Sequence, residues 1–104
     1  MGLLSLLLSS SLILGVRPQI AQAPTGVWIT IRIEPHQDNR TLSVNLESDQ
    51  FSTGSLWTLN GTAAPRFHQR QFLDLPAGDY EVSVVLRDGA GHIRASAQST
   101  FSRL

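Results

Sequence analysis

Three histidines and eight carboxylates are the side chains of this chain that could take part in acid–base, nucleophilic or metal chemistry. A hydrolase triad needs a serine or cysteine nucleophile beside a base and an orienting carboxylate, and the chain has serines but no cysteine. No serine lies in a recognisable nucleophile elbow. The histidines, His36, His68 and His92, do not occur at the spacing of a metal-ligand pair. The sequence therefore predicts that the protein is not an enzyme and has neither a metal site nor a cofactor.

The expected positions of two histidines also disfavour zinc. If Val27 to Ile33 is the first strand of a sandwich, the loop after it, with His36, lies at the opposite end from the last hairpin turn, with His92. Strands of about seven residues would separate these ends by about 20 Å. Asp88 to Gly91, before His92, lacks the regular carboxylates and terminal glutamate of a calcium loop. We expect polar loop histidines and a plain hairpin turn.

Trp28 and Arg32 are the candidate contacts with a partner. Trp28 is the one large aromatic residue expected on the outward side of a strand, and Arg32 follows four residues later on the same side. Trp and Arg are enriched among the residues that dominate binding energies. The alternative is that Trp28 lies under a loop or a second sheet.

The elements that must position these residues are β-strands. Apolar and polar residues alternate with a period of two after residue 24, and no segment has the apolar stripe of a helix. Six or seven strands are expected, among them Val27 to Ile33, Leu42 to Leu46, Ser55 to Leu59, Phe67 to Leu75, Tyr80 to Leu86 and Ile93 to Phe101. The last two form a hairpin. This pattern predicts an all-β fold, a single Greek-key β-sandwich.

One run carries a family resemblance: Leu73-Asp74-Leu75-Pro76-Ala77-Gly78-Asp79-Tyr80-Glu81-Val82-Ser83-Val84, followed by Asp88 and Gly91. It resembles the closing strands of bacterial immunoglobulin-like, fibronectin type III-like and polycystic-kidney-disease-like domains, over about the last 35 residues. The resemblance implies an immunoglobulin-like sandwich with a tyrosine corner, in which the Tyr80 hydroxyl bonds to upstream backbone and Gly78 allows the turn. It also implies that Trp57 is a core residue of the third strand. Such folds host many unrelated functions, so no activity follows.

The N-terminal residues predict export. Leu3 to Val16 is apolar but short for a bilayer, and Ala21-Gln22-Ala23 is the small-x-small triplet of a signal-peptidase site. No Lys or Arg precedes the apolar run, and Pro24 would follow the scissile bond, which counts against clean cleavage. We expect residues 1–23 to be a signal peptide or a retained membrane anchor, with a mistaken start codon or a buried apolar arm as further alternatives. Residues 24–104 are then the sandwich domain.

Composition limits the partners. The domain of about 80 residues keeps seven of the eight arginines and all eight acidic residues, a net charge of −1 without a basic stripe, so nucleic acid and anionic membrane surfaces are poor partners. Without cysteine, the fold has no disulfide to stabilise it. Eight arginines and no lysine are typical of GC-rich bacterial genomes.

These observations predict a small exported protein of the bacterial envelope, periplasmic or extracellular, with a non-catalytic binding or structural accessory role. Its partner is expected to be an envelope or extracellular protein or glycan, and membrane contact is expected only through the N-terminal segment. The first alternative is a membrane-tethered accessory subunit whose leader persists, anchored to the inner membrane. The next is a small hydrolase that depends on His68 or another histidine.

Overall fold

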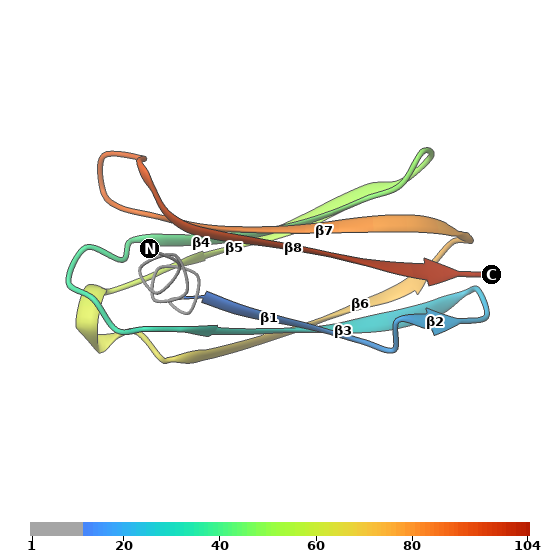
Figure 1. The fold of residues 1–104 in the computed structure, drawn as a ribbon, viewed down its shortest axis with the longest axis horizontal. Helices are drawn as coiled ribbons and strands as arrows, with labels where there is room; N and C mark the ends of the chain where they lie inside the picture. The colour runs from blue at the N-terminus through green and yellow to red at the C-terminus, as the bar shows by residue number, and fades with distance from the viewer. Residues whose placement is uncertain (1–11) are drawn as a thin grey trace, which may run out of the picture.

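A computed structural model describes residues 12–104, which form two β-sheets packed face to face (Figure 1). The elements are β1 (Leu12–Arg17), β2 (Ile20–Ala21), β3 (Thr25–Ile33), β4 (Thr41–Glu47), β5 (Ser52–Thr58), the short 3-10 helix η1 (Gly61–Ala63), β6 (Phe67–Leu75), β7 (Gly78–Arg87) and β8 (Ile93–Arg103). The all-β sandwich predicted from the alternating pattern is confirmed. The first part of the predicted leader, residues 1–11, lies outside the described residues.

The strand order is that of a Greek-key sandwich. One sheet has the order β1-β3-β6 and the other has the order β2-β8-β7-β4-β5. Neighbouring strands are antiparallel except for β2, which runs parallel to β8. The chain passes repeatedly from one sheet to the other, so strands distant in sequence become neighbours.

Part of the predicted leader lies within the sandwich. β1 pairs with β3 along its whole length, from Leu12 opposite Ile33 to Arg17 opposite Trp28. After β1 the chain moves to the other sheet, where β2 pairs with the last residues of β8. Leu12 and Val16 are buried in the core. The folded sandwich therefore includes residues ahead of Pro24, where the domain was expected to begin.

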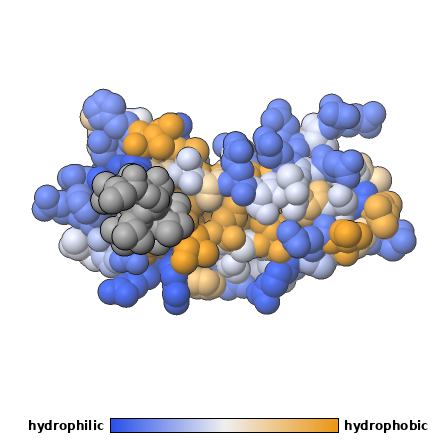
Figure 2. Space-filling model, in the orientation of Figure 1, coloured by the Kyte–Doolittle hydropathy of each residue, from blue (hydrophilic) through white to orange (hydrophobic). Residues whose placement is uncertain are grey.

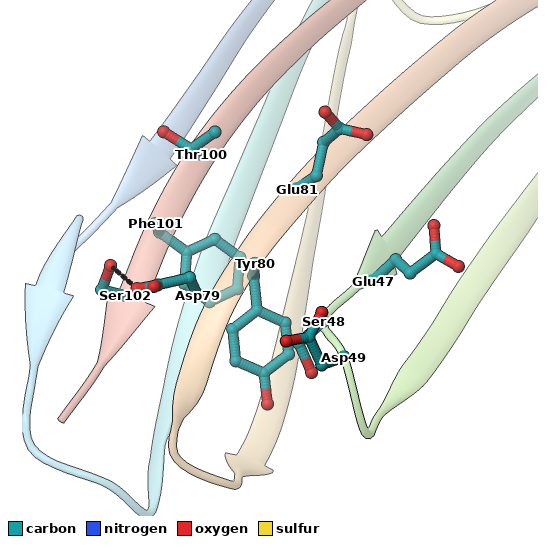
Figure 3. Close-up of a pocket in the computed structure, with 9 residues that line it drawn as sticks. All are labelled: Glu47, Ser48, Asp49, Asp79, Tyr80, Glu81, Thr100, Phe101 and Ser102. Atoms are coloured by element: carbon teal, nitrogen blue, oxygen red, sulfur yellow. Dashed lines mark hydrogen bonds between the residues drawn. The ribbon is translucent and has the colours of Figure 1, made fainter.

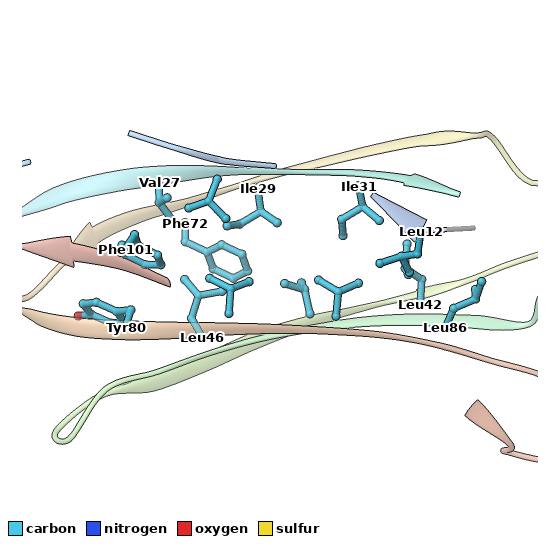
Figure 4. Packing of buried hydrophobic residues seen from close by; sticks show 14 of the residues in the cluster. Leu12, Val27, Ile29, Ile31, Leu42, Leu46, Phe72, Tyr80, Leu86 and Phe101 are labelled. Carbon is cyan, nitrogen blue, oxygen red and sulfur yellow. The ribbon is translucent and has the colours of Figure 1, made fainter. Parts of the chain in front are cut away.

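The core lies between the two sheets and is built from the inward residues of each strand (Figure 4). From the three-stranded sheet these include Val27, Ile29, Ile31, Phe72 and Leu75, and from the five-stranded sheet Leu42, Val44, Leu46, Val82, Val84 and Leu86. Full burial of one such side chain stabilises the folded state by about 1.5–3 kcal/mol relative to leaving the side chain exposed to water. Because the chain has no cysteine, this packing and the strand ladders carry its stability.

The strand count places two loops at one end of the sandwich. The loop after β3 and the β7–β8 turn meet at the same end: the Arg94 Nε donates to the Asn39 Oδ1 at 3.1 Å, and the Arg40 amide donates to the Arg87 carbonyl at 2.9 Å. The prediction that these loops lie at opposite ends was wrong. Four strands, β4 to β7, separate the two loops, and an even number of crossings returns the chain to the end from which it started.

Arg103, the penultimate residue, is buried with only 2% of its surface exposed. Its guanidinium donates to the carbonyl oxygens of Thr25 at 3.2 Å, Gly26 at 2.7 Å and Ser102 at 2.8 Å, and lies 4.8 Å from the Phe101 ring centroid. Burial lowers the pKa of Arg103 from its usual value. Since the ladder between β3 and β6 shifts register at this point, Arg103 satisfies the carbonyls of the bulge and joins the two sheets.

Tyr80 lies at the start of β7 with its side chain buried. Its hydroxyl donates to the Pro76 carbonyl at 2.7 Å, and its ring stacks on Phe101 with a centroid distance of 4.7 Å. Gly78 has φ of +155°, and a Cβ there would lie 3.4 Å from the Ser48 Cβ. This is the geometry of a tyrosine corner, in which a buried hydroxyl fixes the turn before a strand.

We predict that a chain beginning at Pro24 is less stable than one beginning at Leu12 by at least about 3 kcal/mol. The shorter chain loses two buried aliphatic side chains and leaves one edge of β3 unpaired. Urea unfolding of both chains, followed by circular dichroism, measures the difference. Equal unfolding midpoints would contradict the structural role of β1.

We also predict that Tyr80→Phe lowers the free energy of unfolding by about 1 kcal/mol, because it removes one buried hydrogen bond and keeps the ring. Thermal and urea unfolding measure the change. Tyr80→Leu removes the stacked ring as well, and it is expected to lower the free energy of unfolding further than Tyr80→Phe does. A Phe variant as stable as the original chain would show that the corner bond contributes nothing.

Candidate functional site

The outward side chains of β1, β3 and β6 form one continuous surface across the three-stranded sheet. Three register rows cross it: Ile13–Arg32–Phe67, Gly15–Thr30–Gln69 and Arg17–Trp28–Gln71. We call these nine residues the outer face. Strand alternation positions them, because the residues between them on β3 point into the core. The predicted contact residues Trp28 and Arg32 both lie on this face.

Large apolar side chains are exposed on the outer face. Ile13 is 52% exposed, Trp28 40% and Phe67 53%, and the exposed Leu73 lies two residues beyond Gln71 on β6. Other exposed hydrophobic residues, such as Ile20 and Ile93, lie on other elements, and the side drawn in Figure 2 shows hydrophobic patches scattered among hydrophilic residues. Single exposed hydrophobic residues are common, whereas several on one sheet face are typical of a contact surface.

The equivalent surface of the five-stranded sheet has a different composition. Its three rows across β4, β7 and β8 are Ser43–Val85–Ser96, Asn45–Ser83–Gln98 and Glu47–Glu81–Thr100. Serine, threonine, asparagine and glutamine dominate these rows, as expected for a sheet that faces water. On the edge strand β5 the same surface also exposes Leu56, which is in register with Ser43. The two surfaces also differ in charge, because the outer face has two arginines and no carboxylate while these rows have two glutamates and no cation.

A hollow of about 670 Å³ lies over the acidic end of the five-stranded sheet (Figure 3). It is lined in part by Glu47, Asp49, Asp79 and Glu81, and Glu47 and Glu81 are register partners. Asp79 accepts a hydrogen bond from the Ser102 hydroxyl at 2.7 Å. No histidine lines the hollow, so its hydroxyls have no imidazole base beside them.

The three histidines occupy separate positions. His68 is buried, with its ring 5.4 Å from the Trp57 ring and its Nε2 3.0 Å from the Pro65 carbonyl oxygen. His36 and His92 are on the two loops that meet at one end, each beside an aspartate of its own loop. Within residues 12–104, no three His, Asp or Glu side chains are grouped so as to hold a metal ion.

Asp88 holds the β7–β8 turn. Its carboxylate accepts the backbone amides of His92 at 2.8 Å and Ala90 at 3.0 Å. These contacts, led by the His92 amide, lower the pKa of Asp88 from its ordinary value. The carboxylate that suggested a calcium loop thus accepts hydrogen bonds from its own turn.

Trp57 lies on β5, the edge strand of the five-stranded sheet, and is half-buried against the core. Because β1 and β2 precede the strands counted from the sequence, β5 is the fifth strand of the described chain and not the third.

Of the nine residues of the outer face, only Trp28 and Arg32 were singled out from the sequence, and the large side chains of Ile13, Arg17 and Phe67 were missed. Ile13 and Arg17 lie on β1, within the predicted leader. A signal did exist for Phe67, since Phe67, Gln69 and Gln71 alternate with the buried His68 and Phe72 on β6.

No protein-family model matches this sequence, and no curated protein matches it. Solved structures with a similar fold include a superoxide reductase (neelaredoxin) from Ignicoccus hospitalis, with a TM-score of 0.65 and 8% identity over 90% of this chain and 80% of that one. The sulfur carrier protein SoxY from Chlorobium limicola f thiosulfatophilum aligns with a TM-score of 0.69 and 14% identity, over 90% of this chain and 76% of that one. The human F-spondin reeler domain aligns with a TM-score of 0.63 and 10% identity, over 90% of this chain and 89% of that one. At these identities the likeness shows the fold alone, an all-β sandwich.

Proposed function

We propose that this protein is a non-catalytic binding or structural accessory module that contacts its partner through the outer face. The observation that carries the proposal is the contrast between the two sheets of one small domain. One sheet presents Ile13, Trp28 and Phe67 with two arginines, whereas the rows across β4, β7 and β8 of the other present mainly small polar residues and Leu56 alone is a large apolar residue exposed on the adjoining β5. Aromatic residues and arginine are enriched, and acidic residues depleted, at the centres of binding surfaces.

The place of action that we propose is the bacterial envelope or the exterior of the cell. The apolar N-terminal segment and the Ala21-Gln22-Ala23 triplet support export. The pairing of β1 and β2 with the sandwich supports the alternative in which this segment is retained, because cleavage after Ala23 would remove both strands. Among residues 12–104, no helix is long and apolar enough to span a membrane.

A redox enzyme is the competing proposal, and it rests on the likeness to superoxide reductases at 8% identity. The donor set of this chain gives it little support. The chain has no cysteine, and His68 is enclosed beside Trp57 while His36 and His92 are on exposed loops. The two proposals make different predictions: a redox enzyme requires the histidines for its function, whereas a binding module requires the outer face.

We predict that Trp28→Ala weakens binding by at least about tenfold, because an aromatic residue at the centre of a contact surface typically contributes 2 kcal/mol or more. The purified chain and its variants are tested by surface plasmon resonance against envelope protein fractions and a set of bacterial and plant polysaccharides. Val85→Ala, on the opposite sheet, is the matched control and is expected to bind like the original chain.

Thermal unfolding of each variant confirms that the fold is intact. The proposal fails if no binding in the panel depends on Trp28. It also fails if the chain has a catalytic activity that is lost in His68→Gln and kept in Trp28→Ala.

A further inference from the structure

We propose that the partner of the outer face is an acidic polysaccharide, a chain of pyranose units that carry carboxylates. This inference rests on the proposed function, since it names the ligand class of the same surface.

Charge favours an anionic ligand. The nine residues of the outer face include two arginines, Arg17 and Arg32, and no acidic residue. Arg17 lies directly opposite Trp28, and Arg32 is four residues along the same strand, about 13 Å away by strand rise. A guanidinium can bind a carboxylate through two parallel hydrogen bonds. The face therefore has two anion-binding groups separated by more than one sugar unit, which suits a repeating acidic chain.

The side chains between the arginines match the rest of a sugar chain. The flat rings of Trp28 and Phe67 offer apolar surfaces against which the C–H faces of pyranose rings can pack. Gln69, Gln71 and Thr30 lie in register beside them and carry the donors and acceptors that sugar hydroxyls need. Gly15 has no side chain, and a Cβ there would collide with the Thr30 hydroxyl. The middle row therefore projects less far from the sheet than the rows that contain Trp28 and Phe67.

The size of the face favours a narrow ligand over a folded protein. Three strands about 4.8 Å apart, with rows covering about 13 Å along the strands, form a footprint of a few hundred Å² at most. A stable protein interface buries about 800 Å² on each partner. An extended peptide that binds through backbone hydrogen bonds would pair with the free edge of β1 or β6, whereas the outer face itself offers side chains alone.

The test uses polygalacturonate, whose units carry carboxylates, and its fully methyl-esterified form, which has the same backbone without the charge. Binding of the full chain is measured by isothermal titration calorimetry and by affinity electrophoresis. We expect binding of polygalacturonate that weakens as salt is raised, and at least about tenfold weaker binding of the ester.

Four variants identify the surface. Arg17→Gln with Arg32→Gln is expected to reduce polygalacturonate affinity by at least about tenfold, and Trp28→Ala is expected to reduce it similarly. Arg87→Gln, which removes one positive charge from the other sheet, is expected to leave it unchanged and is compared with Arg32→Gln alone, which is expected to reduce it. Absence of polygalacturonate binding, equal binding of the ester, or equal losses in Arg87→Gln would overturn the inference.

The outcome also separates this inference from the proposed function. If Trp28→Ala abolishes binding of a protein from the envelope panel while polygalacturonate is not bound, the acidic polysaccharide is the wrong ligand and the outer face remains the binding surface. If nothing in either experiment depends on Trp28, both proposals are wrong.

Discussion

The pairing of β1 with β3 is the interaction on which the rest of the structure depends. It gives β3 a neighbour on both sides, which removes an unpaired edge, and it brings Leu12 and Val16 into the core. It also supplies Ile13 and Arg17 to the outer face. The stability of the sandwich and the candidate binding surface thus depend on the same six-residue strand.

The two sheets share a core but meet different surroundings. Their inner faces are apolar and closely packed, as a domain without disulfides requires. In the five-stranded sheet, β4, β7 and β8 turn mainly hydroxyl, amide and carboxylate side chains toward water, and Leu56 is exposed on the edge strand β5. The three-stranded sheet instead exposes Trp28 beside Arg17 and Phe67 beside Arg32, and contact with water alone does not explain such exposed aromatic side chains. A surface that is completed by a partner accounts for this difference.

The parts of the fold that the sequence predicted are those governed by local alternation. The β7–β8 hairpin and β3 follow a period of two, and the parity of β3 placed Trp28 outward. β1 was missed because Leu-Ile-Leu-Gly-Val has the composition of a signal peptide, and only pairing with a strand distant in sequence identifies it as part of the sheet. The error over the loop with His36 has another cause, since it depended on the number of strands between that loop and the last hairpin turn. The arginine pair of the outer face could not be predicted because one member lies on β1.

The most direct test is hydrogen–deuterium exchange of the full-length chain, read by mass spectrometry on peptides that cover β1 and β3. If β1 is a strand of the native sandwich, peptides that contain Leu12–Arg17 are protected, with about half of their amides slowed because an edge strand bonds on one side only. If these amides exchange as fast as those of an unstructured peptide while β3 and β7 remain protected, β1 is not part of the fold. The outer face would then lack the strand that completes it.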